Sequence, residues 1–109
     1  MFLVITRMKV ISEKRRELSQ TFASLSGSIR REQGCMRCDF CQSIDNENRL
    51  FLLEEWETEE QLINHLKSDN YKILRGAMNM LDEPYERILH TVFTPCRNGG
   101  SLSENSKIL

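Results

Sequence analysis

Residues 49–57 form the segment that most restricts what this chain can fold into. Their alternation and their large apolar residues predict a β-strand. Apolar side chains occur on both of its faces: Leu50, Leu52 and Trp56 on one, and Phe51 and Leu53 on the other. An antiparallel sheet with one face in water is normally polar on that face. We therefore expect both faces of the sheet that contains this strand to be covered.

Three segments before this strand carry clear periodic patterns. Residues 2–10 alternate and are rich in β-branched side chains, which predicts a first strand. A long helix is expected next, beginning at Ser12 as the N-cap and ending before Gly34. Its apolar stripe consists of Leu18, Phe22, Leu25 and Ile29. Residues 35–43 alternate again, and the polar cluster 45–48 is typical of a turn, so residues 35–57 predict a β-hairpin.

The second half of the chain predicts two helical stretches and a last strand. Thr58 and Gln61 match a capping box, so a helix is expected to begin at Thr58. Residues 68–70 predict a break before a second helical stretch, which Pro84 ends. Residues 85–93 read as a strand, and residues 96–109 are polar and aperiodic. We expect one domain over residues 1–95 and a flexible tail over residues 96–109.

The resulting order is strand, helix, strand, strand, helix, strand. This is the βαββαβ order of the ferredoxin-like α+β fold, in which helices cover one face of an antiparallel sheet. A chain of 109 residues has no further element for the second apolar face. We therefore expect a second copy of the chain to cover it, which makes the functional unit a homodimer.

Charge and composition narrow the class of protein. Fifteen Lys and Arg balance sixteen Asp and Glu, which argues against a nucleic-acid partner. The apolar runs at residues 2–5 and 50–53 have four residues each, far fewer than the roughly 20 that a membrane span needs. Arg7 and Lys9 interrupt the one apolar stretch near the start, so no signal peptide is expected. The four cysteines are then expected to stay reduced in a cytoplasm.

Several short pieces occur together in one register over residues 2–93. They are Gly34-Cys35-Met36-Arg37, the strand that ends in Leu53-Glu54-Glu55-Trp56, Thr58-Glu59-Glu60, and His65-Leu66-Lys67-Ser68. In this set the chain resembles the antibiotic biosynthesis monooxygenase domain family. The resemblance implies a dimeric α/β barrel built from two ferredoxin-like subunits. It also implies one of several activities, because members include cofactor-free oxygenases of quinols or polyketide hydroquinones, isomerases, haem-degrading enzymes and proteins without an assigned activity.

Two residues match family positions with catalytic chemistry. His65 matches the family's histidine on the second helix, where an imidazole could remove a phenolic proton. Trp56 matches the tryptophan that ends the central strand, where an indole could form a pocket wall and offer one N–H donor. The alternatives are a helix-border histidine that only makes hydrogen bonds and a tryptophan that only fills the core.

Five further residues are candidates for substrate binding. Tyr71, Arg75 and Asn79 lie four residues apart, so we expect them to share one helix face and to line a pocket. A solvated charge is the alternative for Arg75. Thr6 and Arg75 stand where the haem-degrading branch has an asparagine and a histidine, and an arginine cannot ligate iron. We therefore expect no haem and no other cofactor, with Thr6 and Cys38 as pocket residues.

The spacing Cys35, Cys38, Cys41, with Cys96 as a fourth thiol, is similar to an iron–sulfur ligand run. On a regular strand, however, Cys35 and Cys41 point to one face, about 20 Å apart, and Cys38 points to the other. We therefore expect no metal site. A redox-sensing role and simple apolar packing remain the alternatives for these residues.

The function favoured by these observations is a cofactor-independent monooxygenase that oxidises a small aromatic hydroquinone or phenol with molecular oxygen. His65 would be the base or the orienting residue, Trp56 a pocket wall, and Arg75 a stabiliser of negative charge. The alternatives are a small-molecule-binding or stress-response dimer without catalysis, and an isomerase of a small metabolite.

Overall fold

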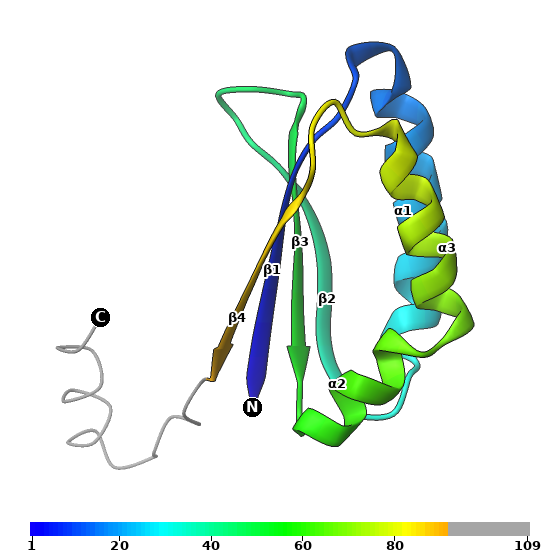
Figure 1. Cartoon of the computed structure of the whole chain (residues 1–109), viewed down its shortest axis with the longest axis vertical. Coiled ribbons are helices and arrows are strands. Elements are labelled where there is room, and N and C mark those ends of the chain that lie inside the picture. Colours follow the sequence, from blue (N-terminus) through cyan, green and yellow to red (C-terminus); the bar gives the residue numbers. More distant parts are fainter. Residues whose placement is uncertain (92–109) are drawn as a thin grey trace, which may run out of the picture.

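A four-stranded antiparallel sheet, with helices on one of its faces, is the framework of the protein (Figure 1). The computed structural model describes residues 1–91. Its elements are β1 (Phe2–Lys9), η1 (Ser12–Lys14), α1 (Arg15–Arg30), β2 (Cys35–Gln42), β3 (Arg49–Trp56), α2 (Glu59–Leu66), α3 (Asp69–Ala77), η2 (Met78–Met80) and β4 (Glu86–Thr91). The strand order is β2-β3-β1-β4. The predicted ferredoxin-like α+β fold is confirmed. The predicted tail, residues 96–109, and Cys96 lie outside the described residues.

The helix ends follow the local sequence with one exception. The side chains of Thr58 and Ser68 accept hydrogen bonds from the backbone N–H of Gln61 and Tyr71, so they cap α2 and α3. The predicted cap at Thr58 and the predicted break at 68–70 are therefore confirmed. The predicted N-cap at Ser12 is wrong, because the chain first makes the 3-10 turn η1 and α1 begins only at Arg15.

The core lies between the sheet and the helices α1 and α3, which run side by side (Figure 1). Alternate residues of the two central strands are buried on this face: Val4, Thr6 and Met8 of β1, and Leu50, Leu52, Glu54 and Trp56 of β3. The helices contribute Leu18, Phe22, Leu25 and Ile29 of α1, and Tyr71, Leu74 and Ala77 of α3. The short helix α2 lies across the end of the sheet where β3 finishes.

The opposite face of the sheet carries apolar side chains that no helix of residues 1–91 covers (Figure 1). These side chains, which we call the outer face, are partly exposed: Leu3, Ile5, Phe51, Leu53 and Ile88. On β1 and β3 they alternate with buried residues of the same strand. The apolar character of both faces, expected from residues 49–57, is thus present in the folded chain.

A β-bulge at the start of β2 changes which cysteines share a face. Cys35 lies opposite Trp56, but Arg37 lies opposite the next residue, Glu55, so Met36 is an extra residue in the strand. Cys35 therefore points to the core face together with Cys38, and Cys41 points to the outer face. The expectation that Cys35 and Cys41 share a face is wrong, since it assumed an unbroken alternation.

Alanine substitutions at two glycines test where the backbone conformation requires glycine. Gly34 has a φ of 86°, and a Cβ there would overlap the side chain of Gln61. Gly76, in α3, has no atom within 4 Å of the place a Cβ would take. We expect Gly34→Ala to lower the free energy of unfolding by about 1–3 kcal/mol. Gly76→Ala should raise it by about 0.5–1 kcal/mol, because alanine loses less backbone entropy in a helix.

Urea denaturation of both variants at one protein concentration checks this pair. A stable Gly34→Ala variant would show that residue 34 does not need its left-handed backbone conformation.

Candidate functional site

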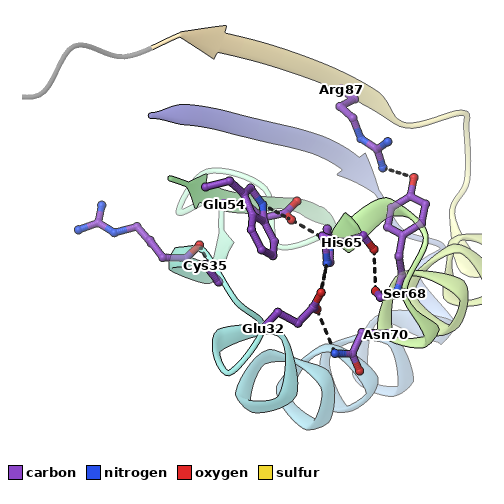
Figure 2. A network of polar contacts seen from close by, with 10 residues as sticks. Glu32, Cys35, Glu54, His65, Ser68, Asn70 and Arg87 are labelled. Carbon is purple, nitrogen blue, oxygen red and sulfur yellow. Dashed lines mark hydrogen bonds and ion pairs between the residues drawn. The ribbon is translucent and has the colours of Figure 1, made fainter. Parts of the chain in front are cut away.

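A histidine held between two glutamates is the polar centre of the domain (Figure 2). His65, in the last turn of α2, is only 1% exposed. Its Nδ1 lies 3.0 Å from both carboxylate oxygens of Glu32, which belongs to the loop after α1. Its Nε2 lies 3.1 Å from Oε1 of Glu54 on β3. This second contact has the distance of an ion pair but not the alignment of a good hydrogen bond.

Glu54 occupies a position where the pattern of the strand demands an apolar residue. It stands between Leu52 and Trp56 on the core face of β3 and is 3% exposed. A carboxylate there is costly unless an opposite charge and hydrogen-bond donors compensate for the lost water. This break in the apolar stripe is the signal that could have identified Glu54 from the sequence. For Glu32, in a loop, the sequence contains no such signal.

Aromatic rings enclose the histidine. The Trp56 ring stacks on the His65 ring, with centroids 4.5 Å apart, and its Nε1 donates to Oε1 of Glu54 at 3.2 Å. The Tyr71 ring meets the His65 ring edge-on at 5.6 Å. The structure therefore brings together three of the predicted residues, His65, Trp56 and Tyr71.

The two carboxylates decide the charge of the histidine. Burial by itself lowers the pKa of His65, but the contacts with Glu54 and Glu32 outweigh it and raise the pKa above its ordinary value. Asn70 supports this arrangement, since its Nδ2 donates to Oε2 of Glu32 at 3.0 Å. The site therefore favours an imidazolium between two carboxylates, and both ring nitrogens are engaged.

A small pocket lies beside this cluster and has Glu54 in its lining. Its volume is about 90 Å³, and its lining is apolar apart from one carboxylate and one guanidinium: Val4, Glu54, Leu62, Leu66, Arg87 and Leu89. Leu89, on β4, is 56% exposed and lies at the solvent side. Arg87 donates a hydrogen bond of 2.6 Å to the Tyr71 hydroxyl. The pocket thus joins an apolar wall to a buried carboxylate.

The structure separates the remaining predicted residues. Tyr71 is buried, but Arg75 and Asn79 are exposed, and Asn79 lies in η2 beyond the end of α3. Steps of four residues rotate by 40° each around a helix with 3.6 residues per turn, and the buried stripe follows Tyr71, Leu74 and Ala77 instead. The expectation of one shared pocket face for Tyr71, Arg75 and Asn79 therefore fails.

Thr6 and Cys38 are both buried on the core face of the sheet. The hydroxyl of Thr6 has no hydrogen-bond partner within residues 1–91, and its neighbour on β4 is the pocket residue Arg87. Cys38 lies opposite Glu54 on the neighbouring strand. Neither residue is part of the pocket lining itself.

The thiols of Cys35 and Cys38 are held in their protonated form. Burial and the nearby Glu54 raise the pKa of Cys35 to about 11 and that of Cys38 to about 12. Since the thiolate is the form that reacts and binds metals, these residues are poor nucleophiles at neutral pH.

Within residues 1–91, no group of three or more His, Cys, Asp and Glu side chains is arranged to hold a metal ion. No described helix is long and apolar enough to cross a membrane.

Removal of the histidine tests the buried charge cluster. We expect His65→Gln to lower the free energy of unfolding by about 3–5 kcal/mol at pH 6, because Glu54 would remain buried without its cation. The control is Lys72→Gln, which removes an exposed ion pair with Asp69 and should change stability by less than about 0.5 kcal/mol. Equal losses in the two variants would contradict a buried charge pair.

The difference in free energy of unfolding between the unsubstituted protein and His65→Gln should become smaller as the pH rises. A pKa raised by folding means that the stabilisation by His65 is complete below its unfolded value of about 6.5 and is lost as the pH rises through the folded value. In urea denaturation from pH 6 to pH 9, the unsubstituted protein should therefore lose more stability than His65→Gln.

Comparison with known proteins agrees with this fold. The family model described as antibiotic biosynthesis monooxygenase matches residues 1–75. A Nitrosomonas europaea protein named for these monooxygenases superimposes with a TM-score of 0.81 at 23% identity, over 86% of this chain and 100% of its own. A conserved protein from Methanosarcina mazei Go1 has a TM-score of 0.78 at 30% identity, over 82% of this chain and 89% of its own.

Rv0793 from Mycobacterium tuberculosis has a TM-score of 0.79 at 22% identity, over 86% of this chain and 96% of its own. No curated protein matches the chain. Since the family model covers more than half of the sequence, including Glu32, Glu54, Trp56 and His65, the chain belongs to the antibiotic biosynthesis monooxygenase family.

Proposed function

We propose that this protein is a monooxygenase that oxidises a small aromatic hydroquinone or phenol with molecular oxygen and without a cofactor. One observation carries the proposal: an apolar pocket has Glu54, a buried carboxylate residue, in its lining. A flat apolar ring fits apolar walls, and its hydroxyl group can donate a hydrogen bond to a carboxylate. Family membership supports the monooxygenase class.

The reaction needs only the substrate, oxygen and a proton acceptor. Loss of the hydroxyl proton leaves an electron-rich phenolate, which can pass an electron to oxygen. One oxygen atom then bonds to a ring carbon that carries hydrogen. The other leaves as water, together with the hydroxyl proton and the hydrogen of that carbon. The product is the corresponding quinone, so no external reductant is consumed.

The roles of the residues follow from their placement. His65 acts as an orienting residue, because both of its ring nitrogens face glutamates and its ring does not line the pocket. Trp56 forms the layer behind Glu54. Arg87 lines the pocket and Arg75 does not, so Arg87 is better placed to stabilise negative charge.

Oxygen uptake tests this function. With a panel of substituted hydroquinones, we expect oxygen consumption and a product that has gained one oxygen atom and lost two hydrogen atoms. Leu89→Trp should raise KM about tenfold, equivalent to ~1.4 kcal/mol of binding, by narrowing the pocket mouth. The control is Ile73→Trp, because Ile73 is similarly exposed but lies on α3 and is not part of the pocket lining.

Other outcomes point to the alternatives. Binding of a hydroquinone without oxygen uptake would support a small-molecule-binding dimer that lacks catalysis. A product with the mass of its substrate would support an isomerase.

We further propose that the protein works as a homodimer that is formed through the outer face. Two of these faces, packed together, would remove from water the side chains of Leu3, Ile5, Phe51, Leu53 and Ile88. Exposed apolar patches of this kind usually mark an interface. A cytoplasmic location stays a prediction from the sequence.

Light scattering at micromolar concentration tests the dimer. We expect twice the mass of the chain, and a monomer for Ile5→Glu, because Ile5 lies between Leu53 and Ile88 and a charge there would be buried without a partner. Ile73→Glu, on the helical side, should leave the mass unchanged. A monomeric unsubstituted protein would overturn this proposal.

A further inference from the structure

Glu54 has one oxygen engaged and one oxygen free. Nε1 of Trp56 donates to Oε1 at 3.2 Å, and Nε2 of His65 lies 3.1 Å from the same oxygen. Within the described part of the chain no donor reaches Oε2. Glu54 lines the pocket and its Oε2 makes neither of these contacts, so we take Oε2 as the oxygen that a bound hydroxyl group would approach. His65 and Trp56 themselves lie behind this carboxylate.

A carboxylate in an apolar wall loses its hydration, which is costly unless a counter-charge compensates for it. The imidazolium of His65 compensates for this loss. His65 in turn keeps its proton because Glu32, whose side chain is 17% exposed, accepts from the opposite ring nitrogen. The charge of Glu54 therefore depends on Glu32, although the two carboxylates lie on opposite sides of the imidazole ring (Figure 2).

We propose that Glu54 is the catalytic base that accepts the hydroxyl proton of the substrate, and that Glu32 is a positioning residue that keeps Glu54 ionised through His65. This inference rests on the proposed function for its substrate class. In the step, the substrate O–H bond breaks, its electron pair stays on the phenolic oxygen, and a new O–H bond forms at Oε2 of Glu54. The proton returns to the peroxide oxygen that leaves as water.

The groups around the cluster are compatible with this assignment. From β2, the thiols of Cys35 and Cys38 face Glu54 and remain protonated. From α3, Tyr71 meets the edge of His65, and from β4, Arg87 bonds to the Tyr71 hydroxyl. Two carboxylates, one imidazolium and the Arg87 guanidinium of the pocket lining together carry no net charge. The site is therefore compatible with a neutral hydroxyl donor.

The first test needs no substrate. Nitrogen NMR of the two histidines reports the charge of His65, with His90→Asn used to assign the signals. We expect a doubly protonated His65 at pH 7, a lower pKa in Glu32→Gln, and recovery in Glu32→Asp. Glu17→Gln, an exposed change on α1, is the control and should have no effect. A neutral His65 at pH 7 would overturn the role of Glu32.

The second test measures the contact with the hydroxyl group. Trp56 is the single tryptophan of the chain, so its fluorescence reports binding next to Glu54. Hydroquinone should bind about tenfold more tightly than 1,4-dimethoxybenzene, which lacks the hydroxyl donor. Glu54→Gln should reduce this difference. Equal affinities for the two probes in the unsubstituted protein would overturn the assignment of Glu54.

The third test is turnover of a hydroquinone over a range of pH. Glu54→Gln should lower kcat about 100-fold or more, as expected for loss of a general base. In Glu32→Gln the alkaline limb of kcat/KM should move to lower pH, because His65 would lose its proton earlier. If Glu32→Gln lowered kcat/KM by the same factor at every pH, the role of Glu32 would be only structural. If Glu54→Gln kept full activity, Glu54 would not be the catalytic base. If hydroquinone binds as predicted but is not oxidised, the oxygenase function fails while the contact with Glu54 stands.

Discussion

The buried charge of Glu54 is the constraint on which the rest of the site depends. A carboxylate that is 3% exposed needs a cation, and His65 supplies it from α2. The cation needs a second carboxylate, and Glu32 supplies it from the loop after α1, held by Asn70 at the start of α3. One charge in the middle of a strand thus fixes the relative positions of α1, α2 and α3 at one end of the sheet.

Periodicity predicted most of the fold and only part of the site. The alternation of β1 and β3 and the stripe of α1 place Val4, Leu52 and Leu18 in the core, because burial of apolar surface follows these periods closely. The cap at Thr58 could also be predicted, because its hydrogen bond joins residues only three positions apart. Glu32 was not, since its contact with His65 joins residues 33 positions apart and depends on how a loop folds.

The cysteines of β2 show how one inserted residue defeats a periodic argument. Met36 interrupts the ladder, so Cys35 turns to the core face with Cys38 while Cys41 keeps its place on the outer face. No composition rule marks a bulge at this point. A consequence for the chemistry follows, because burial beside Glu54 keeps these thiols protonated and leaves the negative charge of the site on the carboxylate.

Strand β3 serves two surfaces with alternate residues, and this explains its composition. Its even-numbered residues from Leu50 to Trp56 build the core and the site, and its odd-numbered residues Phe51 and Leu53 build the outer face. A shift of register by one residue would move Glu54 out of the core and Phe51 into it. Burial of the core residues and burial of the outer-face residues therefore favour the same register of β3. A second chain packed on the outer face would stabilise the register that brings Glu54 to His65, so assembly and site formation depend on the same pairing of β1 with β3.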